Sequence, residues 1–215
     1  MTITFSPFPL FLSKGPPFSA ASLFCPVFLF LEWTRRVPPH FLHSKLIVGV
    51  QMKLRAYRPD DRLTLAELFH RTVHTVNAKD YTAQQLEVWA TGQMDLDAWN
   101  QSFLEHTTVI AEANGTVLGF GDMDNTGYLD RLYVHRDFQN KGVATAILAA
   151  LEQKALLAEI CHFVTYAYIT AKPFFESRGY FVIEENIVIR SGIPLINYRM
   201  EKTCIAYDNP FVTQT

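Results

Sequence analysis

From Met52 onwards, the hydrophobic positions switch between the two-residue period of a strand and the roughly 3.6-residue period of a helix. Residues 53–57 alternate as a strand does, and the apolar side chains within 63–75 recur at helical spacing. The turn at 58–61 separates these segments and ends in Asp61, a residue type that caps helices. The pattern therefore predicts a strand followed by a capped helix.

Two short helices are predicted next. Thr82 is an N-cap candidate for a helix over 83–90, and Asp95 or Asp97 opens a third helical run that contains Phe103. All three candidate caps have side-chain oxygens that can accept a hydrogen bond from the first turn of a helix. We therefore expect three helices between the first strand and the strands that follow.

The clearest local signal is a hairpin. Residues 107–113 and 116–123 are apolar-rich and flank Asn114-Gly115, the dipeptide that a type I′ turn favours. The later pattern predicts four more strands and two more helices. In chain order these are a strand at 128–134, a helix at 143–160, a strand at 161–168, a short helix at 171–179, and strands at 180–190 and 194–202. The domain is thus mixed α and β.

Residues 1–51 differ from the rest of the chain. They hold 8 of the 17 phenylalanines and 7 of the 11 prolines, and they follow neither period. Three interpretations stay open: an extension that is poorly ordered or not native to the protein, a membrane or targeting segment, and an ordered accessory. Residues 15–31 are uncharged, but 17 residues are at the lower limit of a membrane span. We expect the first interpretation, with the folded domain at 52–203 and a tail at 204–215.

The charge balance argues against one class of partner. The chain carries a net charge of −2, made up of +3 in residues 1–51 and −5 in the remainder. Nucleic-acid-binding proteins usually show a positive excess, so we expect no nucleic-acid partner. The three cysteines are odd in number and lack metal-ligand spacing, which favours reduced thiols in a cytoplasmic protein.

Residues 130–148 change from strand to helix through Gln139, Asn140, Lys141 and Gly142. The first N–H groups of a helix lack partners within it and carry partial positive charge, so such a corner can bind an anion. Gly142 would let a ligand approach the backbone, and Lys141 adds a charge. The glycine spacings of the nucleotide P-loop and of the dinucleotide fold are absent. From these residues alone, a diphosphate cradle and an ordinary turn stay equally open.

Two motifs carry a family resemblance. LYVHRDFQNKGVATAIL, at 132–148, resembles motif A of the GNAT superfamily of N-acetyltransferases, in which Gln/Arg-x-x-Gly-x-Gly/Ala opens a helix after a strand. AKPFFESRGYFV, at 171–182, resembles motif B, and the run TAKPFF suggests a small bacterial subgroup of uncharacterised members. The order of elements fits over 53–202, about 150 residues.

The resemblance implies a mixed, mostly antiparallel sheet, flanked by helices, that splays between the motif A strand and the next one. It also implies acetyl-CoA as cosubstrate and no metal. The pyrophosphate would bind backbone N–H groups of the loop, the pantetheine arm would pair with the motif A strand, and an N–H near Val134 would polarise the thioester carbonyl. The implied cofactor-binding residues are Leu132, Tyr133, Val134, Gln139, Asn140, Lys141, Gly142, Val143, Ala144, Thr145 and Phe174.

Two positions depart from the family pattern. Tyr168 stands where many members carry an asparagine that contacts the pantetheine. Phe175 stands where many use a tyrosine to protonate the leaving thiolate, and phenylalanine has no proton to give. Either another group serves as the acid, or the thiolate leaves without one. Tyr168 and Tyr198 are the nearest candidates in sequence, and Ser177 is a weaker one.

Asp130 is the candidate general base, acting directly or through a water, because it precedes the thioester position on the motif A strand. It could equally be a structural carboxylate paired with Arg131 or Arg199. Tyr168, the candidate acid, could likewise serve only aromatic packing. The expected catalytic residues are therefore Asp130 and Tyr168, each with a structural alternative.

Other singled-out residues have mainly structural interpretations. His70 and His74 share a helix face at a metal-compatible spacing, but no third ligand is evident, so we expect solvated or capped histidines. Trp89, Trp99 and Phe103 should pack the first helices on the sheet, or line the acceptor pocket.

The sequence thus predicts an N-acetyltransferase that moves an acetyl group from acetyl-CoA to a primary amine by direct attack. A catalytically weak acyl-CoA-binding module is the alternative, which Phe175 supports. The acceptor would be a small molecule or a peptide, and a membrane partner is not expected. The oligomeric state, a homodimer included, stays open.

Overall fold

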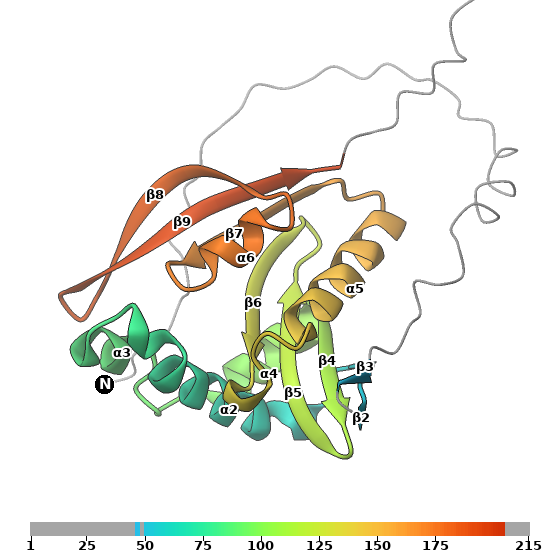
Figure 1. Ribbon diagram of the computed structural model, residues 1–215, viewed down its shortest axis with the longest axis horizontal. Coiled ribbons are helices and arrows are strands. Elements are labelled where there is room, and N and C mark those ends of the chain that lie inside the picture. The colour runs from blue at the N-terminus through green and yellow to red at the C-terminus, as the bar shows by residue number, and fades with distance from the viewer. Residues whose placement is uncertain (1–45, 48–49, 205–215) are drawn as a thin grey trace, which may run out of the picture. The chain divides into compact units, whose positions relative to one another are not determined.

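Figure 1 shows the computed structural model of the protein, in which residues 46–47 and 50–204 are described. The candidate membrane segment 15–31, the rest of 1–45 and the tail 205–215 lie outside the described residues. Within the described part, no helix is long and apolar enough to cross a membrane.

The described strands form one seven-stranded sheet in the order β3-β4-β5-β6-β7-β9-β8, and β1 and β2 pair separately. Neighbours in the large sheet run antiparallel except β6 and β7, which run parallel. This confirms the expected mixed, mostly antiparallel sheet. The strands are β1 (Leu46–Ile47), β2 (Val50–Gln51), β3 (Lys53–Ala56), β4 (Thr107–Ala113), β5 (Thr116–Met123), β6 (Tyr128–Val134), β7 (His162–Tyr168), β8 (Phe181–Arg190) and β9 (Ile193–Thr203).

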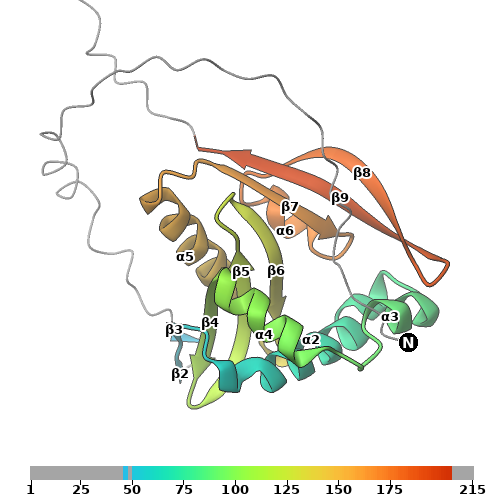
Figure 2. The same cartoon turned by 180° about the vertical axis from the view of Figure 1, so that it is seen from behind.

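Helices cover both faces of the sheet, as the two opposite views in Figures 1 and 2 show. Helix α5 packs on β4, β5 and β6, while α2 and α4 pack on the opposite face of the same strands. The helices are α2 (Arg62–Thr75), α3 (Ala83–Trp89), α4 (Leu96–Glu105), α5 (Val143–Leu157) and α6 (Lys172–Glu176), with 3₁₀ turns η2 (Pro59–Asp61), η3 (Asn77–Lys79) and η4 (Arg136–Phe138).

For the three predicted helices, the caps Thr82 and Asp95 are confirmed, Asp95 being the one of the pair Asp95 and Asp97 that caps α4. Thr82 accepts a hydrogen bond from the Gln85 N–H, and Asp95 accepts from the first turn of α4. The prediction for Asp61 is wrong, because its side chain makes no cap bond to α2. Instead the Asp61 carboxylate accepts two hydrogen bonds from the Arg55 guanidinium, both at 2.8 Å, and one from the Arg58 N–H. A charged donor on the neighbouring strand thus displaces the local cap.

Two turns set the ends of other elements. In the β4–β5 hairpin, Asn114 and Gly115 have φ values of 49° and 77°, as a type I′ turn requires. Helix α5 ends at Leu157 instead of the predicted 160, and Glu159 takes a left-handed φ of 62° just after it. A left-handed residue cannot continue a right-handed helix.

The sheet separates two hydrophobic clusters. One lies under α2, α3 and α4 and contains Trp89, Phe103 and Phe120, with Trp99 packed against it. The other lies under α5 and contains the fully buried Ile147 and further residues of β5, β6, β7 and β9. The prediction that the aromatic residues of the first helices pack on the sheet is therefore confirmed.

The sheet splays between β6 and β7. The two strands pair only at Tyr128 with Val164 and at Leu129 with Thr165. On the β5 side, Asp122 pairs with Arg131 but Met123 pairs with Leu129. Asp130 is therefore the extra residue of a bulge, and bulges bend a strand and increase its twist. Beyond Leu129, β6 has no strand partner on its β7 side among the described residues.

A buried group of charges lies beside the bulge. Asp122 is fully buried and accepts two hydrogen bonds from Arg131, both at 2.8 Å, while His106 Nδ1 lies 2.6 Å from Asp122 Oδ2. The Arg131 guanidinium also lies over the Phe103 ring, 4.2 Å from its centroid. Because a buried carboxylate is costly without partners, these contacts tie α4, β5 and β6 together.

Gly127 is required where the parallel pairing starts. Its φ is +89°, and an added Cβ would lie 2.2 Å from the His162 carbonyl oxygen, whereas Gly115 has a similar φ of +77° with open space around it. We predict that Gly127→Ala lowers the free energy of unfolding by at least about 2 kcal/mol more than Gly115→Ala. Urea unfolding of both variants measures this difference, and equal losses would contradict the close approach.

The His106–Asp122 contact predicts a pH dependence of stability. The hydrogen bond to Asp122 raises the pKa of His106, and burial opposes this effect. Protonated His106 therefore stabilises the native state below the pKa of the unfolded chain, and this stability is lost as the pH rises through the folded pKa. We expect His106→Gln to cost about 1–3 kcal/mol at pH 5.5 and clearly less at pH 9, measured by urea unfolding. A loss independent of pH would show that the imidazole acts only by packing.

Candidate functional site

A cavity of about 910 Å³ opens where β6 and β7 diverge. Its walls come from α2, η3, α3, β6, the start of α5, β7 and α6. Every residue that the sequence predicted for cofactor binding lines this cavity, and so do Asp130 and Tyr168. Because β6 and β7 diverge, the predicted residues of motif A and motif B line the same cavity.

The loop before α5 is shaped by two left-handed residues. Asn140 has a φ of 59° and Gly142 a φ of 82°, conformations that asparagine and glycine adopt more readily than other residues. Two side-chain bonds hold the loop: Gln139 Nε2 donates to the Val134 carbonyl at 2.6 Å, and Lys141 Nζ donates to the Asp137 carbonyl at 2.8 Å.

The first N–H groups of α5 face the loop. The first bond within the helix runs from the Ala146 N–H to the Gly142 carbonyl, so the N–H groups of Val143, Ala144 and Thr145 have no acceptor inside the helix. The Val143 side chain is buried in the core and anchors this turn. N–H groups arranged in this way at a helix N-terminus can bind an anion.

Two positively charged side chains flank this turn. Lys141 lies in the loop, and Arg178 reaches over from the end of α6, with Nη2 2.9 Å from Thr145 Oγ1. Sequence reasoning considered Lys141 but missed Arg178. The available signal was its place in motif B, directly before Gly179, but only the fold brings α6 against the first turn of α5.

A threonine that sequence reasoning also missed fixes the end of β6. The buried Thr72 of α2 donates its hydroxyl to the Val134 carbonyl at 3.1 Å. The same carbonyl accepts from Gln139, so the last peptide of β6 is held from two sides. The strand edge that lines the cavity therefore has a fixed orientation.

Asp130 lines the cavity from the bulge of β6. Its side chain is 22% exposed, and Oδ2 lies 3.2 Å from Arg131 Nη2. Burial raises the pKa of Asp130, and the charge of Arg131 opposes this. The structural pairing with Arg131 is present, whereas Arg199 pairs with Glu201. Asp130 thus combines an ion pair with access to the cavity, and a raised pKa suits a group that accepts a proton.

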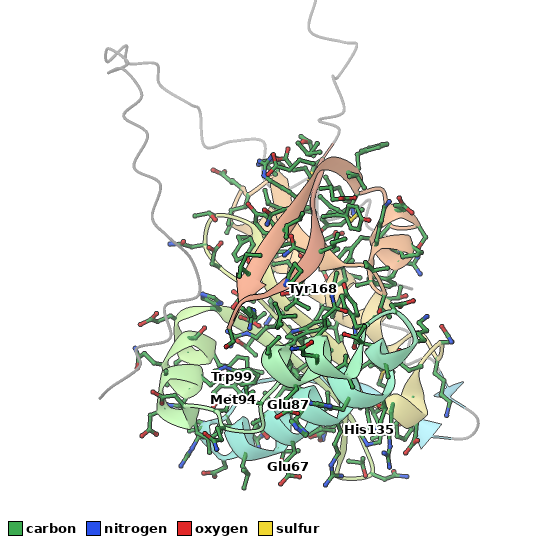
Figure 3. The ribbon with its side chains drawn as sticks, turned by 90° about the vertical axis from the view of Figure 1, so that its left-hand side faces the viewer. Glu67, Glu87, Met94, Trp99, His135 and Tyr168 are labelled. Atoms are coloured by element: carbon green, nitrogen blue, oxygen red, sulfur yellow. The ribbon has the colours of Figure 1, made fainter. Side chains whose placement is uncertain are left out.

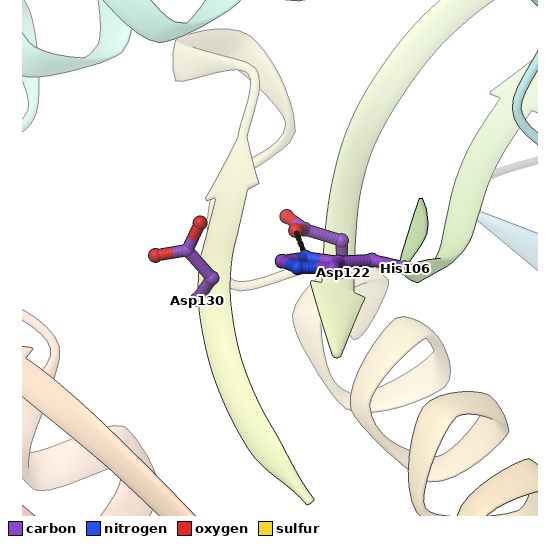
Figure 4. A group of neighbouring side chains, drawn as sticks. All are labelled: His106, Asp122 and Asp130. Carbon is purple, nitrogen blue, oxygen red and sulfur yellow. Dashed lines mark hydrogen bonds and ion pairs between the residues drawn. The ribbon is translucent and has the colours of Figure 1, made fainter. Parts of the chain in front are cut away.

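His106, Asp122 and Asp130 are close enough together to hold a metal ion, with ligand atoms within 4.8 Å of one another. Figure 4 shows His106 against Asp122, while Asp130 points away from them on the neighbouring strand. The Arg131 guanidinium contacts both carboxylates and supplies the positive charge at this place. The His70 and His74 rings lie 4.4 Å apart, and His74 Nε2 contacts the Ala90 carbonyl at 2.8 Å.

Tyr168 lies where the β8–β9 ribbon meets α3, as Figure 3 shows. Its ring centroid is 4.0 Å from that of Trp89, and its hydroxyl interacts with Arg190 and Asn197. Burial raises the pKa of Tyr168, so the phenol keeps its proton. Tyr168 therefore both packs and presents a proton donor at the cavity wall.

The other acid candidates are less well placed. Tyr198 and Ser177 do not line the cavity, and the Ser177 hydroxyl donates to the Phe174 carbonyl at 2.6 Å. Phe175 does line it, packed against Tyr180. Tyr133 and Tyr166 are further phenols in the wall that sequence reasoning did not consider as acids.

Comparisons with known proteins agree with this geometry. A family model for the acetyltransferase (GNAT) domain matches residues 77–202. The uncharacterized N-acetyltransferase YafP of Escherichia coli (strain K12) is 30% identical over 149 residues, which is 69% of this chain and 94% of YafP.

Solved structures show the same fold. A GCN5-related N-acetyltransferase from Rhodopseudomonas palustris is 31% identical, with a TM-score of 0.68 over 71% of this chain and 95% of that one. The PaiA N-acetyltransferase of Thermoplasma acidophilum, solved in complex with coenzyme A, is 19% identical, with a TM-score of 0.60 over 71% of this chain and 99% of that one. On the family match, the relatives and the fold together, this chain belongs to the GNAT family of acetyltransferases and is an acyltransferase.

Proposed function

We propose that this protein transfers an acetyl group from acetyl-CoA to a primary amine, which attacks directly without a covalent enzyme intermediate. The observation that carries the proposal is the single cavity between β6 and β7, which joins the anion site at the start of α5 to Asp130 and Tyr168. The acceptor would be a small molecule or a peptide, in the cytoplasm, with no nucleic acid or membrane involved. The acidic balance of residues 52–215 is compatible with a cationic acceptor.

The residues of the cavity fit the parts of coenzyme A. The N–H groups from Gln139 to Thr145, with Lys141 and Arg178 beside them, would hold the pyrophosphate, because helix N-termini and guanidinium groups bind phosphates well. The unpaired side of β6 at Leu132 and Tyr133 would hold the pantetheine arm as an added strand would. Two structures of this fold were solved with such a ligand: PaiA of Thermoplasma acidophilum with coenzyme A, and the acetyltransferase YncA of Salmonella typhimurium with acetyl-CoA.

Each catalytic role then falls to a group of this chain. Acetyl-CoA would supply an activated thioester. The N–H near Val134 would stabilise negative charge on the carbonyl oxygen, in a position fixed by Thr72. Asp130 would accept a proton from the amine, directly or through a water, and Tyr168 would donate one to the thiolate.

The second candidate function is a catalytically weak acyl-CoA-binding module, and Phe175 favours it because this cavity-lining side chain has no proton to give. Release of free thiol from acetyl-CoA, measured with a panel of primary amines, separates the two functions. We expect release with at least one amine. Tight binding of coenzyme A by calorimetry without release on any amine would favour the module, and no binding at all would refute both.

The proposed phosphate-binding loop before α5 predicts that a substitution at Gly142 weakens coenzyme A binding selectively. Gly142 and Gly179 have nearly the same φ, 82° and 83°, but only Gly142 lines the cavity. We expect Gly142→Ala to weaken coenzyme A binding at least about tenfold, roughly 1.4 kcal/mol, since a Cβ there strains the loop that presents the N–H groups. Gly179→Ala carries the same backbone strain outside the cradle and should leave binding within about twofold. Calorimetry on both variants measures the difference, and equal effects would contradict the assignment.

The two catalytic candidates predict separate kinetic signatures. Asp130→Asn should lower kcat/KM by about 10²–10⁴-fold, and wild-type activity should fall as the pH drops through the raised pKa of Asp130, because only the carboxylate accepts a proton. Tyr168→Phe keeps the ring packed on Trp89 and should lower kcat with little change in KM. Steady-state kinetics from pH 5 to pH 9 measures both. An unchanged kcat for Tyr168→Phe would mean that the thiolate leaves without this acid.

A further inference from the structure

Exposed apolar side chains gather on one strand of the protein. Of the ten large hydrophobic side chains that are exposed in the described part of the chain, five lie on β8. They are Phe181, Val182, Ile183, Ile187 and Ile189. Ile187 and Ile189 are 57% and 61% exposed. A concentration of this kind on one element marks an interaction surface more often than scattered exposure does.

β8 is also an edge strand. It stands last in the order of the seven-stranded sheet, and within the described residues no strand pairs with its outer side. The strand spans ten residues and contains neither lysine nor proline, two residue types that protect such edges, and its charged residues are Glu184, Glu185 and Arg190. Its backbone N–H and C=O groups on the outer side are thus a template for another strand.

The outer half of the β8–β9 hairpin has little support from the rest of the sheet. β7 pairs with β9 only from Asn197 to Thr203, so residues 193–196 of β9 pair with β8 alone. On the β9 side, Tyr81 donates to the Ile196 carbonyl at 3.0 Å and Gln85 to the Pro194 carbonyl at 2.8 Å. Figure 1 shows the hairpin extending past the end of β7. Helix α3 packs against β9, where Leu195 is fully buried, and a third strand would extend the ribbon on the β8 side.

The charges of β8 are self-complementary. A two-fold axis perpendicular to the sheet would pair β8 antiparallel with its own copy and keep each face on the same side. With Ile187 on that axis, Glu184 lies opposite Arg190 of the second copy, twice, and Ile187 lies opposite Ile187. With Glu185 on the axis, two like charges would face each other instead. Of the registers centred on a residue of β8, only the one on Ile187 places opposite charges against each other; it covers residues 184–190 and ends at the bulge between Val182 and Glu184.

We propose that β8 pairs with β8 of a second copy of this chain, in the register centred on Ile187, to form a dimer with a continuous sheet. The proposal rests on the strand edge and does not require acetyl transfer. Because Arg190 also interacts with the Tyr168 hydroxyl, the dimer is measured directly and not through activity. A different protein strand could use the same backbone edge, but it would have no reason to match Glu184 with Arg190.

Sedimentation equilibrium of the full-length chain over a range of concentrations tests the proposal. We expect a dimer, and we expect Ile187→Lys to raise its dissociation constant at least about tenfold, since two like charges would meet at the axis. The matched control is Leu157→Lys on α5, a position that is 76% exposed and distant in sequence from β8, which should leave the dimer unchanged. Far-UV circular dichroism checks that both variants fold.

A charge swap tests the register itself. Glu184→Arg should weaken the dimer, because it places two arginines opposite each other, and the double variant Glu184→Arg, Arg190→Glu should restore it. A monomeric wild type, or a dimer that Ile187→Lys leaves intact, would overturn the proposal. A dimer sensitive to Ile187→Lys but not rescued by the swap would overturn the Ile187-centred register.

Discussion

The short parallel contact between β6 and β7 is the constraint on which the rest of the structure depends. Two strands that stayed paired along their full length would leave no space between them. Here pairing stops after Leu129, and the bulge at Asp130 bends β6 away from β7. The same departure creates the cavity, exposes one side of β6 and places Asp130 at the cavity wall. The same break in strand pairing therefore shapes the sheet and forms the site.

The buried charges explain how this irregular strand is held. A bulge interrupts the regular hydrogen bonds of a ladder, so other contacts must fix the local chain. Arg131, next to the bulge, is held by the buried Asp122 and stacks on Phe103, and His106 adds a third contact. The ion pair is thus best understood as a device that sets position, since buried ion pairs contribute little net stability.

Much of the fold could be predicted from the sequence because its signals are local. Asn114-Gly115 fixes a turn by its own backbone preferences, and Thr82 and Asp95 cap helices within a few residues of themselves. Asp61 has the same local signal, but Arg55 of β3 takes its carboxylate. The local sequence pattern around Asp61 does not show that Arg55 will compete with the helix for its carboxylate.

The site divides in the same way. The residues of the loop and of β6 could be predicted, because they follow one another in motif A and its resemblance names them. Thr72 and Arg178 could not, because each comes from a different helix and meets the loop only after the sheet has splayed. The pairing of Asp130 with Arg131 rather than Arg199 also depended on the fold, since Arg199 lies on β9 with Glu201 as its partner.

The left-handed residues Asn140 and Gly142 have a consequence for ligand capture. Their backbone angles, the Gln139 bond to Val134 and the Lys141 bond to Asp137 hold the loop in shape from within the protein itself. The backbone N–H groups of this loop are thus already oriented before an anion binds. The loop therefore loses little conformational entropy when an anion binds. Less of the binding free energy from each amide contact is then offset by the cost of ordering the chain.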